Sequence, residues 1–337
     1  MPVSLRSFAK INLGLRIGAS RADGYHELLT VYQTIGLHDL VRVSIERGSG
    51  IEIQCADARV PKDETNTCYR VVQGAMPLLR AKGRVLIRID KRLPVRGGLG
   101  GASANAVSTL LGLEQALKKR LPASERLRIV AEVGSDLPLF LLGGTVLGVG
   151  RGEQVYPLPD LPAIACVVVT PELGVSTPKA FAEWDRRKAA ELRSAGQPIA
   201  AVPTRPAHTL TVAQTSDRIT ELSCGLSAWL SEQYSGAPFG RGRAENPLLA
   251  LVRAGIKNDF EEVVFPEYPE LGEAKTALLR AGAKYASLSG SGSTLYGLFA
   301  SKGAARTAAL RVRRLGWDTQ VTATLSRSAY WRRMFVG

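Results

Sequence analysis

The sequence of 337 residues has no apolar run long enough to span a membrane. Its two longest apolar stretches, residues 137–150 and 163–170, fall short of the roughly 20 residues that a membrane helix needs. The first residues also lack the charged start and unbroken apolar core of a signal peptide. We therefore expect a soluble protein with no leader and no membrane partner.

Cysteine is scarce, and its spacing excludes two classes of protein. The four cysteines, Cys55, Cys68, Cys166 and Cys224, are scattered and form no Cys-x-x-Cys pair. Zinc sites and disulfide frameworks both rely on recurring cysteine spacings that are absent here. The sequence thus predicts reduced, mostly buried thiols, no metal site, and a cytoplasmic location.

Acidic residues are outnumbered by basic ones, 30 against 44, which gives a formal net charge of +14. A basic surface suits nucleic acid or an anionic small molecule. Many arginines, however, lie in helical patterns beside alanines and acids, at 181–194 and 304–316, where a solvated helix face explains them. Because there is also no aromatic RNA-binding motif and no dense basic stripe, we expect no nucleic acid partner.

Glycine, in contrast, is concentrated between a strand-like segment at 84–90 and a helical pattern at 103–119. The segment 92–106 reads RLPVRGGLGGASANA, and bare backbone before a helix start can bind an anion. It contains no lysine in or after the glycines, which excludes a Walker loop. Ser103 stands where a dinucleotide fingerprint needs glycine or alanine, which excludes that motif too. A second glycine-rich turn at 288–297 indicates a phosphate-rich ligand held between two domains.

Hydrophobic periodicity predicts an α+β protein of two domains, 1–160 and 161–337. Alternation over residues 11–17 predicts a strand with Lys10 and Asn12 on one polar face. In the second half, strand, helix, two strands, helix and strand follow in the order of a ferredoxin-like domain. Other expected elements are a loop at 21–28, strands at 84–91, 163–170 and 318–325, helices at 68–82, 217–234, 269–281 and 302–315, a helix capped by Ser124, and a Pro/Ala/Ser-rich interruption at 194–209.

Several segments together resemble the GHMP kinases. Proline, a glycine run and Ser-x-Asn-Ala in residues 93–106 are similar to the phosphate loop of that superfamily. Four further segments make the resemblance to one group of these kinases more specific. They are FAKINLGLRI at 8–17, RADGYHELLTVYQ at 21–33, GSDLPLFLLGGTVLGVGRGE at 134–153 and SLSGSGSTLYGLF at 287–299. Among GHMP kinases they look like the kinases of 4-diphosphocytidyl-2-C-methyl-D-erythritol, which serve non-mevalonate isoprenoid precursor biosynthesis.

The resemblance implies a ribosomal S5 domain 2-like N-terminal domain and a ferredoxin-like C-terminal domain. It implies transfer of the ATP γ-phosphoryl group, with Mg²⁺, to the 2-hydroxyl of that cytidyl substrate. Two departures stand in the phosphate loop, where Arg96 and Ala104 replace the usual glycine and serine. The region 182–245 is longer and richer in arginine than the likeness leads us to expect, and we interpret it as a helical insertion.

The resemblance also implies roles for particular residues. Asp136 would be the general base and Lys10 its cationic partner. The ATP-binding residues would be Asn66, Pro94, Arg96, Gly97, Gly98, Leu99, Gly100, Gly101, Ala102, Ser103 and Asn105. The substrate-binding residues would be Asn12, Tyr25, His26, Tyr32, Thr177 and Phe181, with core packing an equal alternative for Phe181.

Two other functions remain open from the sequence. A homoserine or mevalonate-type kinase would keep the fold, but the DGYHE segment at 23–27 argues against it because those relatives lack a cytidine-reading loop. An RNA-binding protein is the second alternative, since the expected N-terminal fold occurs in a ribosomal protein. We expect a monomer or weak homodimer.

Overall fold

The computed structural model describes residues 2–95, 97–194, 219, 222–224, 226 and 256–336. Arg96, most of the expected helix at 217–234 and most of the insertion at 182–245 lie outside these residues. The interruption at 194–209 lies outside them too, apart from its first residue. Within the described part, none of the helices combines the length and apolar composition that crossing a bilayer requires.

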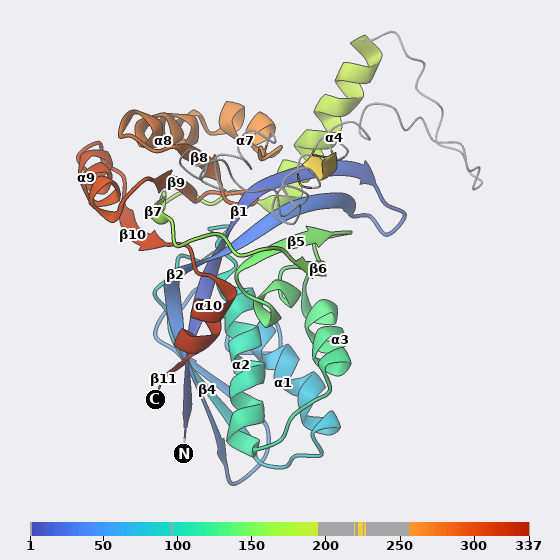
Figure 1. The fold of residues 1–337 in the computed structure, drawn as a ribbon. Coiled ribbons are helices and arrows are strands. Elements are labelled where there is room, and N and C mark those ends of the chain that lie inside the picture. The colour runs from blue at the N-terminus through green and yellow to red at the C-terminus, as the bar shows by residue number, and fades with distance from the viewer. Residues whose placement is uncertain are drawn as a thin grey trace, which may run out of the picture.

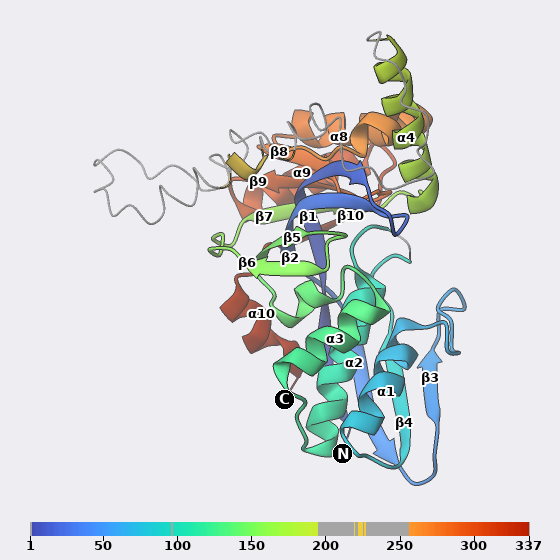
Figure 2. The same ribbon diagram turned by 90° about the vertical axis from the view of Figure 1, so that its right-hand side faces the viewer.

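The first sheet is built on a long antiparallel pair, β1 (Val3–Ser20) and β2 (His26–Glu46). The sheet order is β11-β1-β2-β4-β3, and β5 joins β2 to β6. Its helices α1, α2 and α3 lie together on one side (Figures 1 and 2), and α2 packs directly on β1 and β2. The bounds are β3 (Ile51–Cys55), β4 (Arg84–Asp90), β5 (Thr145–Val149), β6 (Gln154–Pro157), β11 (Phe335–Val336), α1 (Thr67–Leu78), α2 (Gly101–Leu117) and α3 (Ala123–Val133).

β1 and β2 extend well beyond the strands that the sequence predicts. Residues 21–28 form a loop only to Tyr25, and β2 then runs unbroken from His26. Three register shifts bend the pair, between Phe8 and Lys10, Asn12 and Gly14, and Ile17 and Ser20. The far end of the pair reaches the second sheet, and Leu15 and Ile17 join the core under that sheet.

The second sheet confirms the ferredoxin-like order. Its strands β7 (Ala165–Val169), β8 (Tyr285–Leu288), β9 (Leu295–Phe299) and β10 (Thr319–Ala323) are arranged β10-β7-β9-β8, all antiparallel. All of β7 is buried because its residues alternate between two cores. Val167 and Val169 face one core with the helices, whereas Cys166 and Val168 face another that includes residues of β1. The helices are α4 (Thr177–Ser194), α7 (Glu261–Glu267), α8 (Pro269–Arg280) and α9 (Lys302–Arg313).

The ends of several helices differ from the predicted ones, and two of these differences have a clear physical reason. Helix α1 ends at Leu78, not near 82, because Arg80 has a φ of 45° and reverses the chain. Helix α3 begins after Pro122, and the Ser124 side chain does not cap it. Serine caps a helix only from the residue before the first turn, and Ser124 already lies inside the helix.

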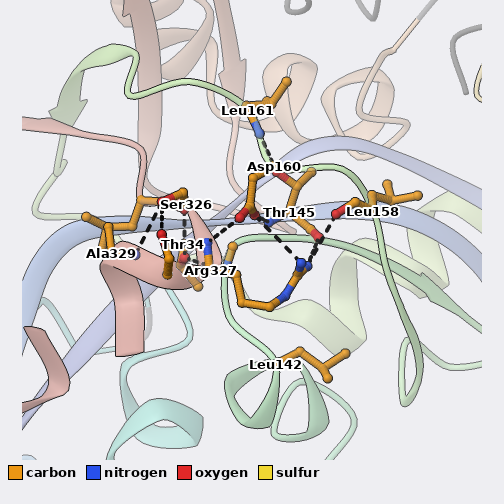
Figure 3. A network of polar contacts seen from close by, with 12 residues as sticks. Thr34, Leu142, Thr145, Leu158, Asp160, Leu161, Ser326, Arg327 and Ala329 are labelled. Atoms are coloured by element: carbon orange, nitrogen blue, oxygen red, sulfur yellow. Dashed lines mark hydrogen bonds and ion pairs between the residues drawn. The ribbon is translucent and has the colours of Figure 1, made fainter. Parts of the chain in front are cut away.

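The chain returns to the first sheet at its C-terminal end. Helix α10 (Arg327–Met334) is held by hydrogen bonds from Arg327 N to Asp160 Oδ2 (2.8 Å) and from its Nη2 to the Thr145 carbonyl (3.0 Å). Figure 3 shows this network at the point where the chain crosses between the two sheets. Strand β11 then pairs with β1. The division into 1–160 and 161–337 stays a prediction.

Candidate active site

Lys10 and Asp136 form an ion pair between the first sheet and a turn that joins two helices. Lys10 lies on β1, and Asp136 lies in the turn that leads from α3 to the short helix η1 (Pro138–Leu141). Lys10 Nζ is 3.2 Å from Asp136 Oδ2, with side-chain exposures of 4% and 35%. The ammonium group is thus enclosed, whereas the carboxylate can still be reached by another molecule.

Asn12 fixes the lysine from the same face of β1, as the alternation predicts. Lys10 Nζ donates to Asn12 Oδ1 over 2.7 Å, and Asn12 Nδ2 donates to Thr30 Oγ1 over 2.8 Å. Thr30 in turn donates to the Gly14 carbonyl. Each polar atom of the Asn12 side chain therefore has a protein partner, which orients the Lys10 ammonium.

Tyr32 supports the carboxylate through its other oxygen atom. Its hydroxyl donates to Asp136 Oδ1 over 3.0 Å. Burial raises the pKa of Tyr32 well above its usual value of 10, and the charge of Asp136 adds to this shift. The phenol therefore stays protonated and acts as a donor. The sequence predicted a substrate contact for Tyr32, and its hydroxyl bonds Asp136.

The glycine loop ends in a helix start whose backbone is open. Gly100 precedes α2 with a φ of 68°, and no described side chain caps the helix there. A Cβ on Gly100 would lie 2.9 Å from Phe140 Cζ and 3.0 Å from Lys10 Cγ. Lys10 N also donates to the Leu99 carbonyl over 3.0 Å. The lysine strand thus holds the loop whose N–H groups can receive an anion.

The two glycine turns meet, as the sequence analysis expected of a shared ligand. Ser289 Oγ donates to the Gly98 carbonyl over 2.9 Å, and Thr294 N donates to the Gly97 carbonyl over 3.2 Å. A Cβ on Gly98, whose φ is 75°, would lie 2.1 Å from the Ser289 carbonyl oxygen. Only glycine permits this approach.

A cavity of about 350 Å³ opens beside the glycine loop. All of its described lining residues lie between positions 59 and 105. The predicted ATP-binding residues that line it are Asn66, Pro94, Gly97, Gly98, Leu99, Gly100, Gly101, Ala102, Ser103 and Asn105. The lining residues that no sequence feature predicted, most of which lie outside any motif, are Arg59, Val60, Pro61, Thr65, Thr67, Cys68, Ile89, Lys91 and Val95.

The two predicted asparagines of this cavity are held by the protein itself. Asn66 caps α1 by accepting from Cys68 N over 2.8 Å, and Asn105 Nδ2 donates to Asp39 Oδ2 over 3.0 Å. Asp39 is fully buried and also accepts from Lys91 Nζ over 2.8 Å. Its position fixes both ends of the loop, a role with no local sequence signal because its partners are distant in the chain.

Three of the predicted substrate residues, Tyr25, His26 and Phe181, lie near the tip of the β1–β2 pair. Tyr25 is 53% exposed, and the Arg151 guanidinium lies 4.9 Å from the centre of its ring. His26 stacks on Phe181 of α4, with ring centres 4.8 Å apart and planes within 10°. His26 Nε2 also lies 2.7 Å from Asp185 Oδ1. Arg151, which the sequence analysis did not name, adds a cation to this group.

Thr177 joins the first turn of α4 to the second glycine turn. Its hydroxyl is 2.7 Å from Ser291 Oγ. Ser291 follows Gly290, and a Cβ built on Gly290 would lie 3.6 Å from Lys10 Nζ. The group around His26 is therefore linked through α4 to the Lys10–Asp136 pair.

The donor set fits a magnesium nucleotide better than a protein-bound metal. No group of three or more metal-binding side chains occurs in the described ranges. Mg²⁺ in nucleotide sites is held largely by phosphates and water. Ser103, half-buried in the first turn of α2, is the one residue with a hydroxyl among the predicted ATP-binding residues.

Comparison with known proteins assigns the family. The model of the GHMP kinases N-terminal domain matches residues 66–144, and that of the GHMP kinases C-terminal domain matches residues 244–316. A 4-diphosphocytidyl-2-C-methyl-D-erythritol kinase from Solibacter usitatus is 36% identical, covering 98% of this chain and 92% of its own. The chain belongs to this GHMP kinase family.

Solved structures of GHMP kinases share its fold. A crystal structure of 4-(cytidine 5'-diphospho)-2C-methyl-D-erythritol kinase, 28% identical, has a TM-score of 0.67 and covers 95% of this chain and 98% of its own. A homoserine kinase from Cytophaga hutchinsonii, 19% identical, has a TM-score of 0.69 and covers 96% and 95%. The expected two-domain GHMP kinase architecture is confirmed, and the protein is a small-molecule kinase for which the family implies ATP.

Proposed function

We propose that this GHMP kinase transfers the γ-phosphoryl group of ATP to the 2-hydroxyl of 4-diphosphocytidyl-2-C-methyl-D-erythritol. The observation that carries the proposal is the Lys10–Asp136 pair, 3.2 Å apart, beside the glycine loop. The name of the Solibacter relative, which is similar along nearly the whole chain, supports the choice of acceptor. The DGYHE segment favours that acceptor over homoserine or mevalonate.

In this proposal Asp136 accepts the proton of the attacking hydroxyl. Its Oδ1 receives a hydrogen bond from Tyr32 and its Oδ2 faces Lys10, so the carboxylate is held in one orientation. Lys10 would also stabilise charge on the transferred group. Phosphoryl transfer depends mainly on such positioning and charge neutralisation.

The nucleotide would lie in the cavity beside the glycine loop. The N–H groups of Gly101, Ala102 and Ser103 begin α2 and would bind the phosphates, with the helix dipole adding to the attraction. Mg²⁺ would enter with ATP and neutralise charge on the phosphates, with Ser103 Oγ as a ligand or a neighbour. Arg96 would add a cation to this loop.

The cytidine end of the acceptor would lie near Tyr25, His26 and Phe181. His26 and Phe181 stack on each other, and the cytosine ring would extend this stack. Arg151, over the Tyr25 ring, supplies a cation that would suit the acceptor's diphosphate. Asn12 and Thr177 would contact its hydroxyls, and the cytoplasmic location and monomer or weak homodimer are part of the same proposal.

A coupled assay of ADP release tests the proposal. We expect turnover with ATP and 4-diphosphocytidyl-2-C-methyl-D-erythritol, dependence on Mg²⁺, and much slower turnover with mevalonate or homoserine. Mass spectrometry should find one added phosphoryl group on the acceptor. Faster phosphorylation of homoserine or mevalonate would contradict the proposed acceptor, and salt-sensitive RNA binding without any ATP consumption would contradict the kinase reaction itself.

A further inference from the structure

Asn258 is buried behind the second glycine turn, away from the nucleotide cavity. Only 3% of the residue is exposed. Its Nδ2 donates to two carbonyl oxygens, those of Leu288 and Gly290, each over 2.8 Å. Its Oδ1 accepts from Phe260 N over 3.1 Å. One amide side chain therefore fixes the carbonyls on both sides of Ser289.

The neighbouring residue attaches the same segment to β1. Asp259 Oδ2 accepts from Ile17 N over 2.9 Å, and Asp259 Oδ1 accepts from Arg16 Nη1 over 2.8 Å. The backbone continues this attachment, since Leu15 N donates to the Lys257 carbonyl over 2.8 Å. The segment 257–259 thus holds the strand that carries Lys10 and Asn12.

The turn that Asn258 fixes lies directly against the reacting groups. A Cβ on Gly290 would lie 3.5 Å from Asn12 Oδ1 and 3.6 Å from Lys10 Nζ. Ser289 Oγ donates to the Gly98 carbonyl in the phosphate loop. The second glycine turn therefore lies close to the Lys10 ammonium and is hydrogen-bonded to the loop, and its position depends on the segment behind it.

We infer that Asn258 is a positioning residue for phosphoryl transfer, and the inference rests on the proposed function. It sets the distance between the phosphate loop and the Lys10–Asp136 pair by clamping the turn at 288–290 while Asp259 clamps β1. The described lining of the nucleotide cavity lies at residues 59–105 and does not include Asn258, whose side-chain hydrogen bonds go to Leu288, Gly290 and Phe260. Loss of the clamp should therefore lower the rate of transfer and leave nucleotide binding intact.

The test compares Asn258→Ala with Thr276→Ala, a control on α8 whose exposed hydroxyl donates to the Gly272 carbonyl of the same helix. The dissociation constant of ATP is measured by calorimetry without acceptor, and kcat by ADP release with saturating acceptor. We expect Asn258→Ala to lower kcat at least about tenfold, because small misplacements of reacting groups cost 10- to 100-fold. Its dissociation constant for ATP should stay within threefold of the wild type, and Thr276→Ala should match the wild type in both.

Ser289→Ala keeps the inference testable if Asn258→Ala does not fold. It removes only the hydroxyl that joins the turn to Gly98, and the same split between kcat and ATP binding is expected. Unchanged kcat in a folded Asn258→Ala or Ser289→Ala variant, or equal losses of ATP binding and turnover, would overturn the inference. The kcat of each variant is divided by the kcat of the wild type, both measured with whichever alcohol the wild type phosphorylates. If the proposed acceptor is wrong, the wild type itself will fail to phosphorylate it, and this result is distinct from an effect of the variants.

Discussion

Lys10 Nζ and Asp136 Oδ2 lie 3.2 Å apart, yet the two side chains come from different layers of the fold. Lys10 is on the sheet and is nearly closed off, whereas Asp136 is in a turn between helices and is 35% exposed. The asymmetry suits their proposed roles. A base must meet the acceptor hydroxyl, while a cation gains electrostatic strength from enclosure.

Substitution of the base tests these roles directly. Asp136→Asn keeps the shape of the side chain but removes the group that accepts a proton, so we expect kcat to fall by about 10²-fold or more. ATP binding, measured without acceptor, should be largely retained because Asp136 is not among the cavity-lining residues. Asp318→Asn, at an exposed position on the second domain, is the matched control. Turnover of Asp136→Asn near that of the wild type would rule out this base.

The contact between the glycine turns predicts that alanine at Gly98 and alanine at Gly50 will affect stability and activity differently. Gly98 and Gly50 both have positive φ, but a Cβ on Gly98 would lie 2.1 Å from the Ser289 carbonyl oxygen, whereas Gly50 has open space. Gly50→Ala should cost about 1 kcal/mol in the free energy of unfolding, from the backbone alone, and leave kcat unchanged. Gly98→Ala should cost more and also lower kcat, because the turn must move away. Denaturant unfolding and ADP release measure the two effects, and equal responses would mean that the turns do not touch.

The aromatic group near the tip of the β1–β2 pair predicts an effect on the acceptor alone. Phe181→Leu removes a ring that stacks on His26 at 4.8 Å. If this ring holds the cytosine, KM for the acceptor should rise at least about fivefold, since base stacking on an aromatic ring contributes about 1–3 kcal/mol. The dissociation constant of ATP should not change.

A purely structural Phe181 would give a different result. The ring also packs edge-on against Phe260, with centres 4.9 Å apart, so a core role predicts a lower melting temperature with an unchanged KM. Phe335→Leu, on exposed β11, is the control for replacing a phenyl group. This comparison decides between the two roles that the sequence left open.

The cysteines predict selective alkylation. Burial raises the pKa of the Cys68 thiol to about 12, so only about one part in ten thousand is thiolate at pH 8. Cys224 is exposed, while Cys55, Cys68 and Cys166 are buried. Iodoacetamide at pH 8 should therefore modify Cys224 alone and leave the kinase active, although Cys68 lines the nucleotide cavity. Peptide mass spectrometry with Cys224→Ser as control checks this, and rapid modification of Cys68 would contradict it.

The raised pKa of Cys68 also predicts the direction in which the free energy of unfolding changes with pH. Cys68 is un-ionised in the folded protein up to about pH 12, whereas in the unfolded chain it ionises near pH 9. Its contribution to stability is therefore complete below pH 9 and is lost as the pH rises toward 12. Cys68→Ala should flatten that part of the unfolding curve, measured by denaturant titration.

The sequence by itself determined the elements and the chemistry they carry. Alternation placed Lys10 and Asn12 on one face, as the 2.7 Å hydrogen bond between them confirms, because a strand fixes the direction of every second side chain. Bare glycines before a helical pattern indicated an anion site, and the order of strands and helices indicated the ferredoxin-like sheet. These features depend on neighbours in the chain, so local physics reveals them.

Only the tertiary structure decided which distant residues meet. Three such contacts depend on bends and crossings of the chain. Tyr32 donates to Asp136, Asp39 accepts from both Lys91 and Asn105, and Asn258 lies behind the second glycine turn. The full length of β2 could not be predicted either, because packing on both faces of a strand removes the alternation that marks a half-buried strand. Buried polar side chains must find partners wherever the fold provides them, and no spacing in the sequence records that choice.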